Sequence, residues 1–461
     1  MTDSNKPGIF DWSPAEPSKL FYQSGDRRPM FARSSGVHVW TSDGARYIDA
    51  SSGAMVSNIG HSNPRVLAAM RAQMDAGTFA YRLHFESEPA ERLATALGRL
   101  CPPGLTRVFF ASGGSEAVES AIKLARQFAL ARGEASRTEI ISRFPAYHGS
   151  TFGTLAVTGY NPLTRPFAPM YRDMPKIPAP RAYLDRDNLT DDEKGVKFAE
   201  ALREKIEEIG PKRALAFIME PIGGASTGAL VAPDSYYQRI RDICDEYGIL
   251  LIYDEVMTGV GRTGKFLAAE HWGQSPDIVV LGKGLGAGYA PLSAIVSRSD
   301  IVDAVIADGG FMHGYTYAGN PLACSAGLAV LKEILDYDLI ANAAAKGEIL
   351  KSRLMALMDR FPFIGDVRGK GLLLAFELVS DRSTMAPLPK AMNAFHKLVE
   401  IAFSEKLVIY ARRTRGGDEG DHFLVCPPMI LSNDDIDEIM DKLTRSLAIF
   451  ARQTGLANRE G

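Results

Sequence analysis

One lysine of this chain stands in a setting that favours covalent chemistry over a place on the surface. Four apolar residues, 278–281, lead directly into the glycine-rich loop that carries Lys283. Burial in a poorly hydrated loop disfavours an ammonium group, so we expect a lowered pKa and a neutral amine that forms a Schiff base with an aldehyde. The loop alone is a weak signal, because most lysines that follow a strand are solvated.

An aspartate ends a second apolar run. Residues 249–253 precede Asp254 and predict a strand covered on both faces, whose tip enters a site. A buried carboxylate there needs a cation or a protonated ring nitrogen as its partner. The stretch from Asp254 to Lys283 is long enough for one helical crossover between parallel strands, whose carboxyl ends then share one edge of a sheet. We therefore expect the acid and the amine to face one space.

A glycine-rich turn supplies a third element. Residues 107–112 predict a strand, Gly113 to Glu116 a tight turn, and 117–130 a helix. Glycines let a ligand approach the backbone, and the free amides and positive dipole end of a helix favour an anion such as phosphate. An ordinary N-cap at Ser115 is the simpler alternative for this turn.

The three elements together describe the partners of one small molecule. An amine for an aldehyde, an acid for a ring nitrogen and a turn for a phosphate are what pyridoxal 5'-phosphate requires. We therefore predict that cofactor. Asp254 would keep its ring nitrogen protonated, and Lys283, once released from the Schiff base, would move a proton.

Six short motifs in a fixed order extend this pattern along nearly the whole chain. They are Ser112–Ala117, Tyr147–Gly149, Met219–Pro221, Tyr253–Val256, Gly282–Gly284 and His313–Pro321. On these residues the chain resembles the class III aminotransferases of the fold type I pyridoxal phosphate enzymes, close to the omega-amine:pyruvate transaminases. The resemblance implies transamination by a ping-pong mechanism.

The resemblance also implies roles for individual residues. Lys283 and Asp254 would be catalytic, Tyr147 and Val256 would lie on the two faces of the ring, and Thr316 would reach the phosphate of a neighbouring subunit. An active site shared across a homodimer, or within a tetramer, follows from that last role. The full set of expected cofactor contacts is Gly113, Gly114, Ser115, Tyr147, His148, Glu220, Asp254, Val256, Lys283 and Thr316.

Substrate choice is read from the residues around these motifs. Relatives that use ornithine-like or gamma-amino acids resemble one another in an arginine just after the Tyr-His-Gly motif, where Ser150 stands here. We therefore predict an amine, or an amino acid with a remote acid group, as donor and pyruvate or a similar 2-oxo acid or aldehyde as acceptor. In the family an arginine of the C-terminal domain binds the acceptor carboxylate.

The position of that arginine departs from the family pattern. Tyr410 occupies the nearest place after the expected strand 407–410, and three arginines follow in a longer loop. We assign Arg412 and keep Arg413 and Arg415 as alternatives. The expected substrate-binding residues are Met55, Tyr81, Ala225 and Arg412, and plain packing is an equal interpretation of the first three.

The order of expected elements predicts an α/β fold. Strands alternate with helices to about residue 330, as in a mostly parallel doubly wound sheet, and a smaller α+β domain would form from the two chain ends. We divide the chain into an N-terminal arm with part of the small domain (1–70), a large cofactor domain (71–330) and a C-terminal small domain (331–461). Asp43-Gly44 marks the turn of a hairpin, and 322–335 and 434–450 predict helices.

Composition excludes several other classes of protein. A net charge of −3 and a pI of about 6.3 give no reason to expect nucleic acid or a membrane as partner. The N-terminus lacks a basic start and an apolar segment, so we expect a cytoplasmic protein. Four scattered cysteines predict small buried side chains, and neither they nor the eight histidines have the spacing of a metal site.

Three alternatives stay open at this stage. Residues 259–265 fit GxGxxG and most of a P-loop, but Phe266 replaces the required hydroxyl residue, so nucleotide binding is disfavoured. A decarboxylase or aminomutase on the same scaffold would share every cofactor motif. A non-catalytic binding protein would be expected to lack Lys283 or to carry a DNA-binding domain.

Overall fold

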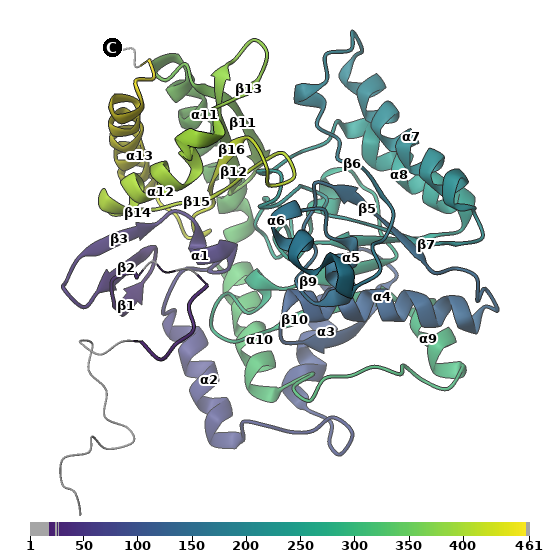
Figure 1. The fold of residues 1–461 in the computed structure, drawn as a ribbon. Coiled ribbons are helices and arrows are strands. Elements are labelled where there is room, and N and C mark those ends of the chain that lie inside the picture. Colours follow the sequence, from purple (N-terminus) through teal and green to yellow (C-terminus); the bar gives the residue numbers. More distant parts are fainter. Residues whose placement is uncertain (1–17, 24, 26, 458–461) are drawn as a thin grey trace, which may run out of the picture.

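A seven-stranded sheet forms the centre of the molecule. The computed structural model describes residues 18–23, 25 and 27–457, and its central sheet has the order β4-β10-β9-β8-β7-β5-β6 (Figure 1). β10 is antiparallel to β4 and β9, while the remaining neighbours pair in parallel. The predicted mostly parallel sheet is confirmed. Its strands are β4 (Leu105–Ala111), β5 (Glu139–Phe144), β6 (Lys176–Pro178), β7 (Ala214–Met219), β8 (Leu250–Asp254), β9 (Ile278–Leu281) and β10 (Ser293–Arg298).

Helices cover both faces of this sheet, because its central strands are apolar on both sides. In β8, Leu250 and Ile252 pack with helices α4 and α9, while Leu251 and Tyr253 pack with α7 and α8 on the opposite face. The helices of this part are α2 (Pro64–Ala76), α3 (Glu88–Leu100), α4 (Gly114–Ala131), α5 (Phe152–Val157), α6 (Asn161–Thr164), α7 (Asp191–Ile209), α8 (Asp234–Tyr247), α9 (Ser299–Ala307) and α10 (Pro321–Asp336).

The N-terminal hairpin and the C-terminal part of the chain lie together on the left of Figure 1. One sheet has the order β1-β2-β3-β14, so a strand near residue 407 pairs with the N-terminal hairpin, and a second has the order β11-β12-β16-β15 with β13 on β12. The bounds are β1 (Phe31–Ser35), β2 (His38–Thr41), β3 (Arg46–Asp49), β11 (Ile364–Lys370), β12 (Leu373–Asp381), β13 (Ala386–Pro387), β14 (Leu407–Val408), β15 (Tyr410–Arg412) and β16 (Asp421–Val425).

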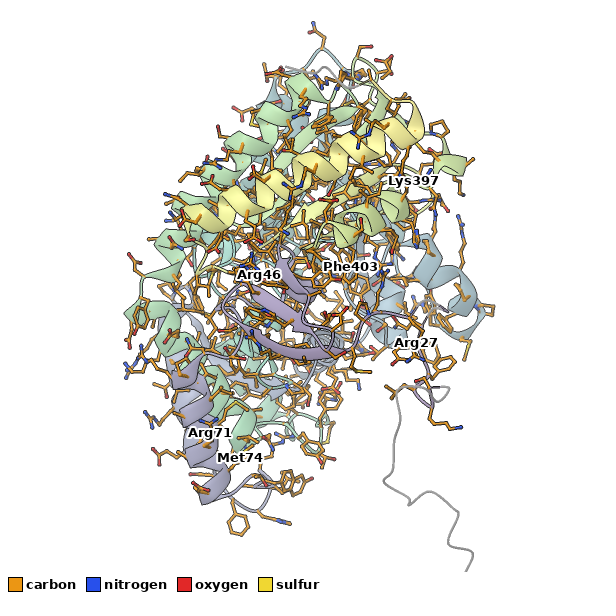
Figure 2. All side chains as sticks on the ribbon, turned by 90° about the vertical axis from the view of Figure 1, so that its left-hand side faces the viewer. Arg27, Arg46, Arg71, Met74, Lys397 and Phe403 are labelled. Atoms are coloured by element: carbon orange, nitrogen blue, oxygen red, sulfur yellow. The ribbon has the colours of Figure 1, made fainter. Side chains whose placement is uncertain are left out.

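Three helices pack against these sheets. They are α11 (Leu339–Arg360), α12 (Ala394–Ser404) and α13 (Asn433–Thr454), and a short irregular helix α1 (Ser52–Met55) leads from β3 toward the central sheet. Figure 2 labels Arg46 of β3 and Phe403 of α12, which are far apart in sequence. The ring of Tyr47 contacts that of Phe403 at 4.6 Å between ring centroids, and Arg46 pairs with Glu438 at 2.8 Å. These contacts bind the N-terminal hairpin to α12 and α13, and the division into domains stays a prediction.

Several sequence predictions can be compared with these elements. The hairpin at Asp43-Gly44 and the helices at 322–335 and 434–450 are confirmed within a few residues, and all four cysteines are buried and free. The N-terminal arm, residues 1–17, lies outside the described residues. Within the described ranges, no helix has the length and apolar character needed to cross a membrane.

The predicted helical crossover between β8 and β9 is wrong. Residues 255–277 contain a single 3₁₀ turn, η3 (Ala268–His271), and otherwise irregular chain. The buried Glu255 explains this path, because its carboxylate accepts from the amides of Ala268 (3.0 Å) and Ala269 (2.9 Å). The buried carboxylate of Glu255 thus accepts from two backbone amides that would bond to backbone carbonyls inside a longer helix.

Candidate active site

The carboxyl ends of four neighbouring strands carry the predicted functional residues. β5, β7, β8 and β9 are adjacent and parallel, and the chain just beyond them holds His148, Glu220, Asp254 and Lys283. All four side chains line one cavity of about 610 Å³. Ligand sites of doubly wound sheets lie at this edge, so the structure brings together the acid and the amine as expected.

Lys283 has a strained backbone in this cavity. Its φ of 38° lies in the left-handed region, which non-glycine residues rarely adopt. Burial lowers the pKa of its amine, although Asp254 and Glu220 act in the opposite direction. The next residue has to be glycine, because a Cβ at Gly284 would lie 2.3 Å from Nδ2 of Asn58. The loop therefore holds a lysine that is easier to deprotonate than an exposed one.

Asp254 and His148 form a buried pair below the cavity. Nδ1 of His148 lies 2.8 Å from Oδ2 of Asp254, and the amide of Val256 donates to Oδ1 at 3.1 Å. Nε2 of His148 is buried and has no hydrogen-bond partner among the described residues. The pair fixes the direction of the Asp254 carboxylate, which still faces the cavity.

Glu220 connects two loops of the cavity wall. Oε1 accepts from the amide of Gly224 at 2.8 Å, and Oε2 accepts from the amide of Tyr147 at 3.3 Å. Burial raises the pKa of Glu220, while His148 and Arg143 lower it. The carboxyl group thus positions Tyr147, whose phenol pKa is raised by burial.

The N-terminus of α4 closes another side of the cavity. Gly114 and Ser115 line it, and no side chain caps this helix end. A Cβ at Gly114 would lie 3.0 Å from Cγ1 of Val256, so glycine is needed for the two segments to approach. Ser115 Oγ accepts from the amide of Ser150 at 3.1 Å. Gly113 caps the helix and lies just outside the cavity.

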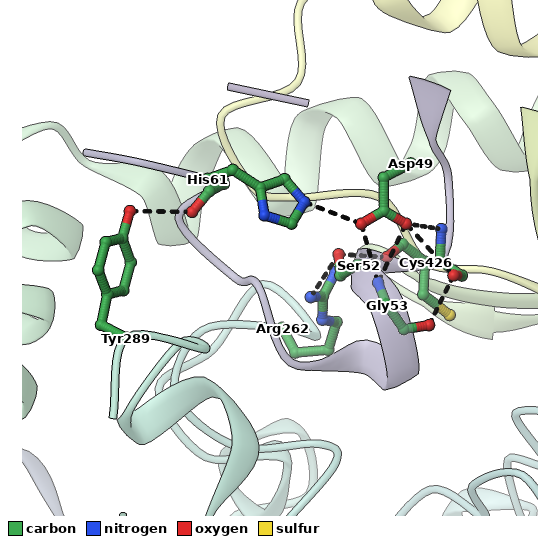
Figure 3. Close-up of polar contacts among 9 residues, drawn as sticks. Asp49, Ser52, Gly53, His61, Arg262, Tyr289 and Cys426 are labelled. Atoms are coloured by element: carbon green, nitrogen blue, oxygen red, sulfur yellow. Dashed lines mark hydrogen bonds and ion pairs between the residues drawn. The ribbon is translucent and has the colours of Figure 1, made fainter. Parts of the chain in front are cut away.

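A second group of polar contacts, the Arg262 cluster, adjoins the lysine loop through Asn58, which packs on Gly284, and Figure 3 shows Arg262 and Ser52 of this group. We define it as Arg262 with Ser52, Asn58 and the carbonyls of residues 372, 426 and 427. Nη2 of Arg262 contacts Oδ1 of Asn58 at 2.7 Å and Oγ of Ser52 at 3.2 Å, and Nη1 donates to the three carbonyls. Arg262 has no exposed surface, and burial lowers its pKa to about 10.

The Arg262 cluster fixes part of the cavity wall. Ser52 is the first residue of the irregular turn α1, in which Gly53 (φ 66°) and Met55 (φ 58°) also have left-handed backbones. Asp49 holds the same turn through the amides of Ser51 and Gly53, and His61 contacts its carboxylate at 3.0 Å (Figure 3). Met55 at the end of this turn lines the cavity. Residues 257–263 are buried and only Lys265, at the end of the GxGxxG-like segment, is exposed, so most of that segment is not accessible to a nucleotide.

Another group, the Arg412 cluster, also lines the cavity, and we define it as Arg412, Tyr410, Tyr160 and Tyr147. Nε of Arg412 donates to the hydroxyl of Tyr410 at 2.9 Å, and the guanidinium carbon lies 5.9 Å from the Tyr160 ring centroid. All four residues line the cavity. Arg412 lies in β15 and not in the expected loop, because Ile409 separates two short strands that join different sheets.

The structure separates the three candidate arginines. Arg413 lines a different, smaller cavity and contacts the ring of Phe395, and Arg415 donates to the carbonyl of Met385. Among the described residues that line the 610 Å³ cavity, Lys283 and Arg412 supply the lysine and arginine side chains. Of the predicted pocket residues, Met55 and Ala225 also lie there.

Two predicted residues do not reach this cavity. Tyr81 packs its ring on His84 at 5.2 Å, and Thr316 is exposed in the turn before α10. Sequence reasoning in turn missed Tyr160 and Leu163, which line the cavity from the chain around α6, and Gln23. Tyr410 could have been placed in the cavity from the sequence, because it lies two residues before Arg412 and residues two apart on a strand share a face.

The residues present fit pyridoxal 5'-phosphate. Gly114 and Ser115 at an uncapped helix end suit its phosphate, the paired Asp254 suits a ring nitrogen, and the amine of Lys283 lines the same cavity to meet an aldehyde. The buried Nε2 of His148, which has no partner among the described residues, is also left for a hydrogen bond with a bound group. We expect these contacts in the cofactor-loaded protein.

Comparison with known proteins points to the same chemistry. Residues 22–447 match the family model described as Aminotransferase class-III. A putrescine–pyruvate aminotransferase of Pseudomonas aeruginosa is 32% identical, over 89% of this chain and 88% of its own length. An (S)-enantioselective omega-transaminase from Thermomicrobium roseum is 34% identical with a TM-score of 0.88, covering 94% of this chain and 96% of its own. An omega-transaminase from Pseudomonas jessenii in complex with PMP is 31% identical with a TM-score of 0.87, covering 93% and 94%.

Proposed function

We propose a substrate class for this protein on one premise: the chain belongs to the class III aminotransferase family and is a pyridoxal phosphate-dependent aminotransferase of fold type I. It takes an amino group from an amine, or from an amino acid with a remote acid group, and passes it to pyruvate or a similar 2-oxo acid. The relatives include proteins named for putrescine and taurine as donors and pyruvate as acceptor.

One observation carries this proposal: Lys283, Asp254 and the guanidinium of Arg412, which has no carboxylate partner among the described residues, line a single cavity. A planar guanidinium suits a carboxylate, as in a 2-oxo acid. Ser150 stands after the Tyr-His-Gly motif, and its amide is occupied by Ser115 Oγ. Because position 150 is a serine, no arginine is available there to bind the carboxylate of ornithine or gamma-aminobutyrate.

The roles of the cavity residues follow from their positions. The bound cofactor supplies an aldehyde for the amino group and a protonated ring that withdraws electrons from the reacting carbon. Asp254, held by His148, keeps the ring nitrogen protonated. Lys283 Nζ, with its lowered pKa, accepts the substrate proton and returns it. Tyr147 and Val256 lie against the ring, and Arg412 orients the acceptor carboxylate.

We further propose that the active protein is a homodimer with shared sites. Residues 78–85 and 312–320 form one surface, joined by Phe79 and Tyr317 (5.6 Å between ring centroids) and by Asn320 donating to the Thr78 carbonyl at 3.0 Å. This surface exposes Leu83 (70%) and Met312 (76%). An apolar surface of this kind favours a protein partner. Tyr81 and Thr316, which miss the cavity of their own chain, both belong to it.

A donor panel with pyruvate tests the substrate class. We expect 1-phenylethylamine, putrescine, beta-alanine or taurine to be used faster than ornithine or gamma-aminobutyrate, with alanine as product. Faster turnover of ornithine or gamma-aminobutyrate would contradict the proposal. Borohydride reduction of the cofactor-loaded protein should attach the cofactor to the peptide that carries Lys283, and the Lys283→Ala variant should lose at least about a thousandfold in kcat.

Sedimentation velocity tests the homodimer. Wild-type protein should sediment as a dimer or larger assembly, and Leu83→Asp with Met312→Asp should shift it toward a monomer and reduce activity in parallel. Lys390→Asp, at a surface position away from 78–85 and 312–320, is the matched control. A fully active wild-type monomer would contradict the shared site.

A further inference from the structure

Two side chains of β15 point to the same side because the strand alternates. Tyr410 and Arg412 are two residues apart and both line the cavity, while Ala411 between them packs against the main apolar core. β15 pairs with β16 through Tyr410–Leu424 and Arg412–His422, so the backbone of both residues is fixed. Their mutual orientation is therefore set by the sheet.

The hydroxyl of Tyr410 then fixes the guanidinium itself. Nε of Arg412 donates to it at 2.9 Å, and the ring of Tyr410 lies 5.5 Å from the guanidinium carbon. Nη1 and Nη2 have no hydrogen-bond or ion-pair partner within residues 18–457 of the described chain. The two donors that match a carboxylate are left for a ligand.

Tyr160 limits the remaining freedom of Arg412. Its ring lies 5.9 Å from the guanidinium carbon, and its hydroxyl donates to the carbonyl of Arg413 at 3.2 Å. Burial raises the pKa of Tyr160, so the ring stays neutral and does not compete as an anion. Arg412 is thus enclosed by two aromatic side chains and held by one of them.

We propose that Tyr410 is a positioning residue that makes Arg412 a fixed carboxylate receptor, and so determines the preference for 2-oxo acids over uncharged aldehydes. This inference rests on the proposed function. A long arginine side chain loses rotamer entropy when it binds a ligand, and a side chain already held at Nε loses less. Tyr410 therefore acts on acceptor binding through Arg412 and touches no reacting atom.

The Tyr410→Phe variant tests this role, because it removes the hydroxyl and keeps the ring. With one fixed amine donor, the KM for pyruvate should rise about tenfold, as expected for one hydrogen bond to a charged group. The KM for butanal should change less than about twofold, because an aldehyde offers nothing to Arg412. An equal change for both acceptors would overturn the proposal, since general damage to the cavity has that effect.

A double-mutant cycle shows whether Tyr410 acts through Arg412. Arg412→Met should raise the pyruvate KM more than Tyr410→Phe, and adding Tyr410→Phe to it should have little further effect. Arg413→Met is the matched control, because that neighbouring arginine does not line the cavity. Independent, additive effects of the two substitutions would overturn the assignment.

The same data separate this inference from the proposed function. If wild-type enzyme uses pyruvate and Tyr410→Phe leaves its KM unchanged, the role of Tyr410 is overturned and the function stands. If wild-type enzyme turns over butanal but not pyruvate, both the acceptor class and the role of Tyr410 fail. The cofactor absorbance of each variant shows that the cavity is intact.

Discussion

Arg262 and Arg412 use their hydrogen-bond donors in opposite ways. Neither has a carboxylate within ion-pair distance among the described residues. Arg262 has both Nη atoms bonded to protein oxygens and a buried Nε without a partner. Arg412 has the reverse arrangement, with Nε bonded to Tyr410 and both Nη atoms left over beside a cavity.

The difference shows how donor use separates a structural cation from a recognition cation. Burying a charge is unfavourable, and neutral oxygen acceptors offset this cost for Arg262. Because these acceptors occupy both of its Nη atoms, Arg262 has no Nη donor left to bind a ligand. Arg412 keeps its two parallel donors for a ligand. The two clusters should therefore respond to mutation in different quantities, stability for one and KM for the other.

The largest effect is expected for Arg262→Met. The free energy of unfolding should fall by about 4 kcal/mol, because Oδ1 of Asn58 and the carbonyl of residue 427 lose their Arg262 donor in the interior. Urea unfolding of the cofactor-free protein measures this loss. A change below about 1 kcal/mol would remove the distinction between the two clusters.

Glu255 extends the comparison to a buried acid of the same connection. Burial raises its pKa to about 7 from 4.5, so the folded state binds the proton more tightly than the unfolded state. The stabilisation that comes from this tighter proton binding is full below about pH 4.5 and is lost as pH rises to about 7. The loss is on the order of 3 kcal/mol, and Glu255→Gln should remove that part of the pH dependence. Unfolding free energies across this range measure the slope, and an unchanged slope in the variant would exclude Glu255 as its source.

A smaller loss is expected for Asn58→Ala. Its amide accepts from Arg262 at 2.7 Å and donates to the Val260 carbonyl at 3.1 Å. Losing both should cost about 2 kcal/mol. A loss below about 0.5 kcal/mol in thermal unfolding would mean that Asn58 does not help to hold Arg262.

The smallest change in stability is expected for Arg412→Met. Its side chain has one protein hydrogen bond and faces a cavity, so the unfolding free energy should change by less than about 1 kcal/mol. The pyruvate KM is the quantity that should change instead. A destabilisation as large as that of Arg262→Met would show that both arginines are structural.

The sequence predicts well those residues whose setting is local. Asp254 and Lys283 each follow a continuous apolar run, and the carboxyl ends of parallel strands meet at one edge, so both positions could be assigned before any contact was known. Arg262 has no such signal. Its partners come from residues 52 and 58 and from residues 372, 426 and 427, and no spacing rule connects them.

The errors have the same origin. The crossover from β8 to β9 was expected to be helical on length alone, and a buried Glu255 organises it differently. Tyr160 reaches the cavity from a loop that has no period to read. Tyr81 and Thr316 were placed by family resemblance, and their roles stay predictions, because Thr316 was expected to act on a neighbouring subunit and Tyr81 lies beside the same surface.

The partners of Arg262 also set an order for the maturation of this protein. Two of the carbonyls that accept hydrogen bonds from Arg262 belong to residues 426 and 427. During synthesis from the N-terminus, the turn that ends at Met55 therefore lacks its final restraint until residues 426 and 427 have been made.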